Sequence, residues 1–475
     1  MPHNICKSAV VINAKRWSAR LTIVLPRTNN RYKLRWDYHR QTKNRDASNE
    51  CCCCFPVHVP APRSVMSTSK TKPHSKRVLI IGGSIAGLLA GNRFQRMGWE
   101  VDIFERVDGP LQGRGAGITI LPGLAESFAA AGVVEQQLGI ELPARLVLDR
   151  EGGTIAERRF GQPMTSWTRL FELLKAAFPE QRYHRGVGLE QLEQDDGQVT
   201  AYFADGTNTR ADILIGADGF RSTVRSIICP DAQPIYPGYI AWRCLVDEAA
   251  LSALTCAVLT DRYVICAAPG EQAIAYAVPG PNFSIEPGKR QFNIVWYHPV
   301  PEDQLPRFLS DDTGRYFPNG IPPALLSKRI RDEMIDIAQR ALAPPFAEAI
   351  RVSPVHFFQP ILDLVPQRIA LGRVAIVGDA AFIARPHTAM GVSKAGGDVL
   401  ALSIAIKQNG HDYQSGLQAF ETERMRVNRA IVANGQYLGQ YMEAQTKSDQ
   451  ARRDAEKMRT PDYILAMAMP MVDYP

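Results

Sequence analysis

A glycine-rich segment, GGSIAG, occupies residues 82–87 and has the residue types of a phosphate-binding loop. Such a loop lets the backbone approach a pyrophosphate, and the helix N-terminus that follows favours an anion. Ser84 replaces the usual middle glycine, adding little bulk and a hydroxyl, and Glu105 lies 18 residues after Gly87, where an acid suits a ribose hydroxyl. The spacing predicts a dinucleotide site, with a structural glycine turn as the alternative. Its expected residues are Gly82, Gly83, Ser84, Ile85, Ala86, Gly87, Glu105 and Arg106.

The elements around this loop form a β-α-β pattern. A short β-branched run, RVLIIG, precedes the loop, a helical pattern closed by Gly98 follows it, and EVDIFE is a second apolar run. Two later runs, ADILIGADG and RVAIVGDAA, end in small residues and an aspartate. Buried parallel strands deliver their loops to one edge of the sheet, so we expect all three loops to lie close together.

The two later runs supply further candidate ligands. The first leads into Asp218 and Arg225, and the second into Asp379, Pro386 and Gly391. An aspartate at a strand end beside small residues can accept a hydrogen bond from a sugar-alcohol hydroxyl. The alternative is that these aspartates only cap the next helix.

The three motifs, in this order over about residues 77–445, resemble those of class A flavoprotein monooxygenases of the p-hydroxybenzoate hydroxylase type. GGSIAG, GYIAWR, NIVWYH and GDAAFIARPH are similar to the 2,6-dihydroxypyridine hydroxylase-like branch. The resemblance implies FAD as cofactor, NADPH or NADH as a transient reductant, O2, and an aromatic or heteroaromatic small-molecule substrate that is hydroxylated. It adds Gly117, Asp218, Arg225, Asp379, Pro386 and Gly391 to the expected cofactor-binding residues.

Two residues are candidates for a catalytic role. His387 follows Pro386, in the segment that passes the flavin in this family, and its ordinary pKa near neutrality suits a base for a phenolic hydroxyl. A structural histidine is the alternative. Arg243, next to Trp242 on an expected strand, is the second candidate, because an unpaired charge is costly in a packed core. Packing on the sheet face without substrate contact is the alternative.

The expected fold class is α/β, with a Rossmann-like FAD-binding domain interleaved with a mostly antiparallel substrate sheet and C-terminal helices. We expect FAD-binding segments at 76–235 and 361–400, the substrate sheet at 236–360, and helices at 401–475. Residues 1–75 have the composition of a disordered basic extension.

Charge is divided unevenly along the chain. Residues 1–77 hold 16 Lys and Arg against 3 Asp and Glu, whereas the remainder holds 39 against 45. The acidic body argues against nucleic-acid binding, and no apolar run is long enough for a membrane span.

We expect no metal site and a cytoplasmic monomer or homodimer. We expect the N-terminal arm to be either a dispensable extension or a mitochondrial presequence. Competing functions are epoxidation or oxidative rearrangement of a polyketide or terpenoid, and non-catalytic binding of flavin or nucleic acid.

Overall fold

Strand β1 (Arg77–Ile81) opens the part of the chain that the computed structural model describes, namely residues 76–111, 117–134, 138–318 and 320–469. The expected extension over 1–75, with its four consecutive cysteines at 51–54, lies outside the described residues. Contacts group residues 72–475 as one unit.

The first sheet has six strands in the order β16-β17-β10-β1-β2-β6, and β1 pairs in parallel with both β2 and β10. Side chains of β1 are almost entirely buried, as expected for a parallel strand covered on both faces. The order reverses direction at β1, which is where α/β sheets bind their ligands. The other strands are β2 (Glu100–Glu105), β6 (Tyr183–Arg185), β10 (Ile213–Gly216), β16 (Ala370–Leu371) and β17 (Val374–Ile376).

Helix α1 (Ile85–Arg96) follows the glycine-rich loop and buries Leu88 and Phe94 completely. The chain leaves it at Gly98, whose φ of +83° favours glycine. This confirms the predicted β-α-β unit. Helices that pack with α1 or with each other on this side are α2 (Pro122–Ala130), α3 (Trp167–Ala176), α9 (Gly391–Asn409) and α10 (Tyr413–Ala444).

The second sheet has eight strands in the order β15-β11-β14-β13-β12-β4-β5-β3. Most neighbours are antiparallel, as predicted, but β4 and β12 pair in parallel. Three strands between residues 117 and 166 join this sheet, although the sequence placed that stretch in the first FAD-binding segment. The strands are β3 (Gly117–Thr119), β4 (Ile140–Leu148), β5 (Thr154–Ser166), β11 (Tyr239–Asp247), β12 (Arg262–Cys266), β13 (Gln272–Val278), β14 (Gln291–Pro299) and β15 (Val355–Pro360).

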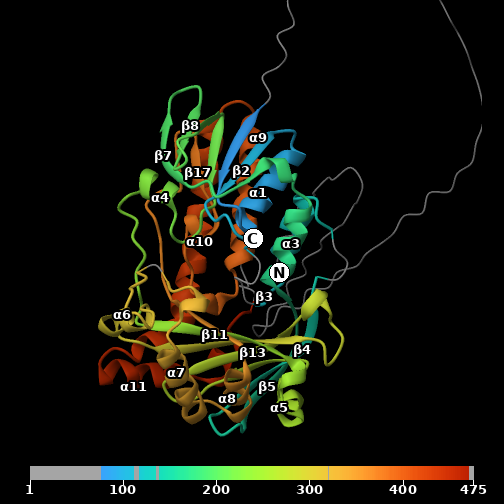
Figure 1. Ribbon diagram of the computed structural model, residues 1–475, viewed down its shortest axis with the longest axis vertical. Coiled ribbons are helices and arrows are strands. Elements are labelled where there is room, and N and C mark those ends of the chain that lie inside the picture. Colours follow the sequence, from blue (N-terminus) through green and yellow to red (C-terminus); the bar gives the residue numbers. More distant parts are fainter. Residues whose placement is uncertain (1–75, 112–116, 135–137, 319, 470–475) are drawn as a thin grey trace, which may run out of the picture. The chain divides into compact units, whose positions relative to one another are not determined.

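The large sheet lies between the FAD-binding layer and a set of helices on its other face (Figure 1). Trp242 is fully buried and stacks on Phe358, and Trp296 lies opposite it in register. Because side chains alternate along a strand, the neighbouring Tyr239, Arg243 and Tyr297 share the opposite face. The covering helices are α5 (Ala253–Leu259), α7 (Lys328–Ala341) and α8 (Pro344–Val352).

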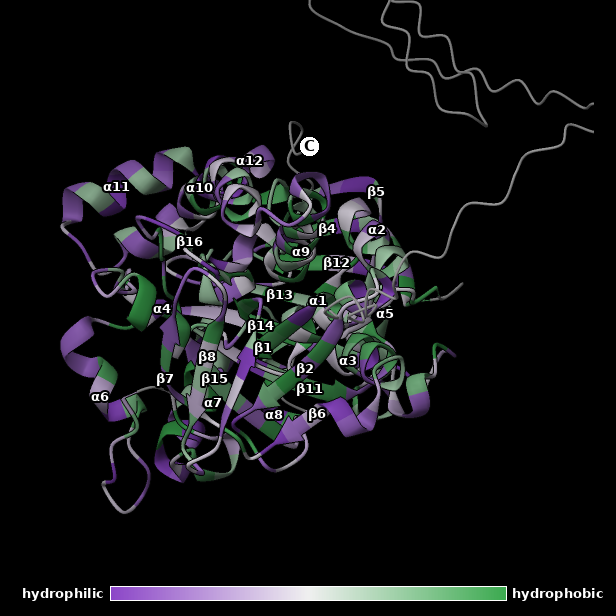
Figure 2. Ribbon diagram, turned by 90° about the horizontal axis from the view of Figure 1, so that it is seen from above, coloured by the Kyte–Doolittle hydropathy of each residue, from purple (hydrophilic) through white to green (hydrophobic). Residues whose placement is uncertain are grey.

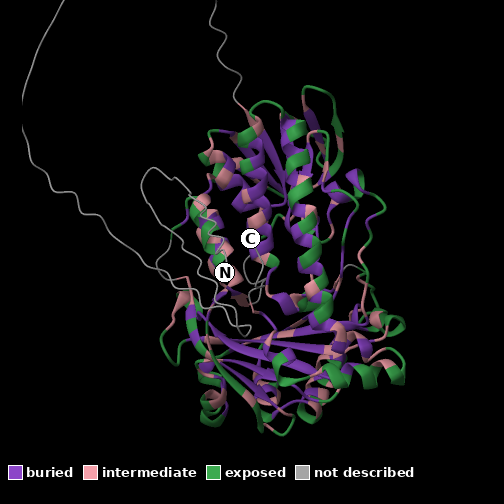
Figure 3. Cartoon of the chain, turned by 180° about the vertical axis from the view of Figure 1, so that it is seen from behind, coloured by how far each residue is buried: buried purple, intermediate pink, exposed green. Residues whose placement is uncertain are grey.

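The remaining elements lie at the periphery. Strands such as β11 and β13 are largely hydrophobic and buried, whereas an outer helix such as α11 is largely hydrophilic (Figures 2 and 3). Among the described residues, no helix combines the length and apolar character needed to cross a bilayer. The peripheral elements are β7 (Leu189–Gln194), β8 (Val199–Phe203), β9 (Asn208–Ala211), α4 (Thr223–Ile228), α6 (Leu305–Phe308), α11 (Asp449–Met458) and α12 (Pro461–Leu465).

A buried polar network fixes α9 and α10 to the loop after β17. Asp398 is fully buried and accepts hydrogen bonds from the backbone N–H of Gly378, from Arg424 Nε and from Asn428 Nδ2, at 2.8 to 2.9 Å. A buried carboxylate is stable only when such partners satisfy it. The network therefore holds the loop that carries Asp379 in place.

Replacing Arg424 by methionine should remove the charged partner of the Asp398 carboxylate. We expect Arg424→Met to lower the free energy of unfolding by about 3 kcal/mol or more, because an uncompensated charge then stays buried. Urea unfolding measures the loss, with the exposed Arg426→Met on the same helix as control. Equal stability of the two variants would contradict this role for the network.

Candidate active site

The three motif loops meet at the carboxyl ends of β1, β10 and β17. Gly82 has a φ of +104°, and a Cβ there would lie 2.4 Å from the carbonyl oxygen of Ala217, which is next to Asp218. The backbone N–H of Ala217 donates to Ile81, and that of Val377 donates to Gly216. The loop around Gly378 in turn packs on Ala86, since a Cβ at Gly378 would lie 3.2 Å from the Ala86 Cβ. The predicted meeting of the three loops is therefore present in the structure.

Glu105 lies directly against the glycine-rich loop. Its carboxylate is buried and accepts hydrogen bonds from the backbone N–H groups of Gly83 (2.8 Å) and Val107 (2.9 Å). Tyr183, from the neighbouring strand β6, donates its hydroxyl to the Gly83 carbonyl at 2.8 Å. The sequence offered no signal for Tyr183, because nothing local links this short strand to the loop. Arg106, the residue after Glu105, is exposed.

The N-cap residue of α1, Ser84, does not satisfy the helix N-terminus with its side chain. Ser84 has extended backbone angles, and its side chain makes no capping hydrogen bond. Ile85 is buried, whereas Gly87 packs so tightly that a Cβ there would lie 1.8 Å from the Gly82 carbonyl oxygen. The free helix N–H groups and the serine hydroxyl can therefore face an anion.

Asp218 and Arg225 both stabilise the loop after β10. The Asp218 carboxylate accepts from the Ser222 hydroxyl and from the backbone N–H of Val224, and burial raises its pKa. Arg225 is buried and donates to the carbonyls of Ala380 (3.0 Å) and Phe220 (2.6 Å). Arg225 thus ties this loop to the one that carries Asp379. The guanidinium is thus engaged by backbone carbonyls of the protein.

The loop after β17 leaves its polar groups accessible. The Asp379 side chain is 54% exposed. Pro386 opens a 3-10 turn, η7 (Pro386–Thr388), and Gly391 is the first residue of α9. Gly391 is exposed, and a Cβ there would have no atom within 4 Å, so the N-terminus of α9 faces open space.

His387 is fully buried between the two layers. Its Nε2 lies 2.9 Å from the Tyr239 hydroxyl, and its ring centroid lies 4.1 Å from that of Tyr297. Burial, together with the charge of Arg385, lowers the pKa of His387 to about 3. The near-neutral pKa on which the general-base hypothesis rested is therefore wrong, because the ring is desolvated. The second ring nitrogen of His387, Nδ1, is buried and has no hydrogen-bond partner among the described residues.

Arg243 projects from the sheet face that Tyr239 and Tyr297 share. It is half-buried, and its Nε is buried without a partner within the described part of the chain. Asn293, on the adjacent strand β14, is buried, and its Nδ2 also has no partner there. Sequence reasoning missed Asn293, because an asparagine in an apolar run carries no motif.

Gly117, on strand β3, packs against Tyr276 of strand β13 within the large sheet. Its carbonyl accepts a hydrogen bond from the Tyr276 hydroxyl at 3.0 Å, and a Cβ on Gly117 would lie 2.2 Å from the Tyr276 ring. Only glycine therefore allows this approach of β3 to β13. The contact supports a positioning role for the residue that the sequence placed in the cofactor site.

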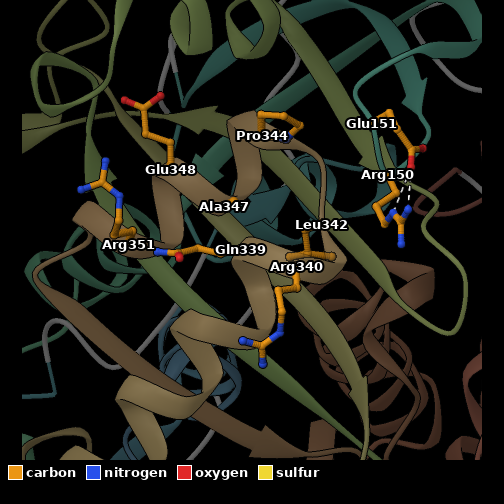
Figure 4. A pocket seen from close by; sticks show the side chains of 9 residues that line it. All are labelled: Arg150, Glu151, Gln339, Arg340, Leu342, Pro344, Ala347, Glu348 and Arg351. Atoms are coloured by element: carbon orange, nitrogen blue, oxygen red, sulfur yellow. Dashed lines mark hydrogen bonds and ion pairs between the residues drawn. The ribbon is translucent and has the colours of Figure 1, made fainter.

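A surface pocket elsewhere does not compete with this site. It lies among α7, α8 and the turn between β4 and β5, and its walls carry Arg150, Glu151, Arg340, Glu348 and Arg351 (Figure 4). These helices cover the face of the large sheet that carries Trp242, away from the three motif loops (Figure 1). We therefore assign the functional site to the motif loops and the face that carries Arg243.

The residues present fit FAD. Side chains are excluded at Gly82 and Gly87, which allows the backbone to approach a pyrophosphate, and the N-terminus of α1 is open. Glu105 stands at the end of β2, and the exposed carboxylate of Asp379 can accept hydrogen bonds from ligand hydroxyls.

Comparisons with known proteins agree with this geometry. The model of an FAD-binding-domain family matches residues 75–237 and 326–435, and that of an FAD-binding-domain-like family matches 236–363. The chain is 30% identical to 2,6-dihydroxypyridine 3-monooxygenase of Paenarthrobacter nicotinovorans, over 76% of this chain and 90% of that protein. It is 26% identical to 3-hydroxybenzoate 6-hydroxylase of Polaromonas naphthalenivorans, over 82% and 94%.

Solved structures show the same fold. The structure of 2,6-dihydroxypyridine-3-hydroxylase from Arthrobacter nicotinovorans superposes with a TM-score of 0.75 at 26% identity, covering 85% of this chain and 99% of that one. HpxO of Klebsiella pneumoniae, crystallised with FAD and uric acid, shares the fold with a TM-score of 0.64 at 21% identity, covering 82% and 97%. The expected fold class is thus confirmed, and the chain belongs to the FAD-binding-domain family of class A flavin monooxygenases.

Proposed function

We propose that this protein hydroxylates an aromatic or heteroaromatic small molecule, using bound FAD, NADPH or NADH as transient reductant, and O2. One observation carries the proposal: the three motif loops meet beside a sheet face on which Arg243 and Asn293 have buried donors without a hydrogen-bond partner among the described residues. The names of the relatives, a dihydroxypyridine monooxygenase and a hydroxybenzoate hydroxylase, support this class of substrate.

FAD, when bound, accepts electrons from the reductant and activates oxygen for transfer to the ring. The protein's own residues bind and orient. Gly82, Ser84 and the N-terminus of α1 would hold the pyrophosphate, Glu105 the adenosine ribose, and Asp379 the ribityl chain. The open N-terminus of α9 at Gly391 would favour negative charge on the edge of the flavin ring, because helix N-termini carry partial positive charge.

Arg243 and Asn293 would select the substrate. Both present buried N–H groups that no described residue accepts, and leaving such groups unsatisfied costs free energy. A ring that carries a hydroxyl, oxo or carboxylate group supplies the missing acceptors and is favoured further by the positive charge of Arg243. Tyr297 on the same face offers an aromatic wall for the ring.

His387 would therefore hold neighbouring elements in position and would not accept a proton from the substrate. A ring with a pKa of about 3 is neutral at physiological pH and is a poor proton acceptor. Its hydrogen bond with Tyr239 connects η7 to the large sheet and so fixes the loop that passes the flavin. The positive charge of Arg243 would instead favour the phenolate form of a phenolic substrate, whose proton would pass to solvent.

Arg243→Met should raise the KM for an aromatic substrate by about tenfold or more, because a charge-assisted hydrogen bond is lost. FAD content should stay unchanged. Substrate-stimulated NAD(P)H oxidation over a panel of phenols, hydroxypyridines and hydroxybenzoates measures the effect. Arg351→Met, at an exposed position on α8, is the matched control. An unchanged KM in Arg243→Met would show that substrate does not reach this face.

Substitutions of Ser84 test directly whether the glycine-rich loop binds the pyrophosphate. Ser84→Gly should bind FAD about as well as the parent, since it restores the commoner loop, whereas Ser84→Val should raise the FAD dissociation constant by about tenfold or more. The β-branched side chain pushes the pyrophosphate away and removes the hydroxyl. Fluorescence titration with FAD compares the three proteins. Equal affinity of the valine variant would mean that no phosphate approaches Ser84.

A further inference from the structure

Lys394 is a fully buried lysine on the first turn of α9, close to the loop that carries Asp379. Its Nζ has no hydrogen-bond partner among the described residues. The hydroxyl of the adjacent Ser393 is also buried without a partner there. A buried ammonium group whose hydrogen bonds are not satisfied is costly, so the donors of this lysine call for an acceptor beyond the described residues.

Two carboxylates lie near this part of α9, and neither accepts a hydrogen bond from the lysine. Asp398, one helical turn further on, already accepts from Gly378, Arg424 and Asn428. Asp379 forms an ion pair with Lys394, with its Oδ1 at 3.6 Å from Nζ, which is beyond hydrogen-bond distance. The Asp379 side chain is 54% exposed, whereas the lysine is 0% exposed. The pair therefore presents a donor and an acceptor side by side at the edge of the motif loops.

A hydroxyl group matches this pair. It can accept a hydrogen bond from the ammonium and donate its own proton to the carboxylate, which satisfies both partners at once. A phosphate suits the pair less well, because Asp379 would repel a second anion. We propose that Lys394 and Asp379 together bind a hydroxyl of the ribityl chain of FAD. This assignment rests on the proposed use of FAD and adds Lys394 to its binding residues.

A role in ligand binding and a role in stability predict different effects of replacing Lys394. If Lys394 only supports the fold, its replacement by an apolar residue of similar length should lower the unfolding temperature. If it serves the ligand, removing a buried ammonium that makes no hydrogen bond to the described residues, and only a 3.6 Å ion pair with the exposed Asp379, should leave the flavin-free protein about as stable as before. Flavin affinity should fall in the second case alone.

The experiment compares the parent chain with Lys394→Met, Lys394→Arg, Asp379→Asn and the double variant Asp379→Asn, Lys394→Met. Lys407→Met, at an exposed position on the same helix, is the control. Each full-length protein is titrated with FAD, riboflavin and ADP, and its thermal unfolding is followed with and without FAD. ADP carries the adenosine and the pyrophosphate but no ribityl chain, and riboflavin carries the ribityl chain without phosphate.

We expect Lys394→Met to weaken FAD and riboflavin binding by about tenfold or more, to leave ADP binding unchanged, and to keep the flavin-free unfolding temperature. The double variant should lose less than the product of the two single losses, because both side chains hold one hydroxyl. Unchanged FAD affinity in Lys394→Met, or a loss shared equally by ADP, would overturn the proposal. A parent chain that binds no FAD would instead refute the proposed function.

Discussion

The close approach of two backbone segments at Gly82 and Ala217 is the contact on which the site depends. A side chain at Gly82 would overlap the Ala217 carbonyl, and the φ of +104° at Gly82 is one that other residues rarely adopt. This contact places the loop after β1 against the loop after β10, and a hydrogen bond from Val377 to Gly216 adds the loop after β17. The rest of the site follows from these neighbouring strand ends.

The two sheets supply different parts of the site. The parallel sheet supplies loops, helix N-termini and carboxylates suited to a cofactor, and the large sheet supplies a face of aromatic side chains with Arg243 and Asn293. The hydrogen bond between Tyr239 and His387 connects the large sheet to the loop after β17. Near this junction, the buried side-chain atoms Arg243 Nε, Asn293 Nδ2 and His387 Nδ1 have no hydrogen-bond partner in the part of the chain that the structure describes.

Features set by local sequence were predictable, and features set by distant neighbours were not. The glycine-rich loop, its flanking strands and the two aspartate motifs follow from short-range patterns, and the structure places all of them as expected. The sequence did not reveal that three strands between residues 117 and 166 pair with the large sheet, because pairing partners far along the chain leave no local signal. The low pKa of His387 arises from burial and from Arg385, neither of which spacing reveals. Tyr183, Asn293 and Lys394 were missed for the same reason.

The stoichiometry of flavin in the purified protein tests the central claim most directly. If the loops after β1, β10 and β17 form one FAD site, the folded protein should contain or take up one FAD per chain. The FAD is then released on denaturation and counted by its absorbance. A correctly folded protein that carries no flavin and takes none up from excess FAD would contradict the account.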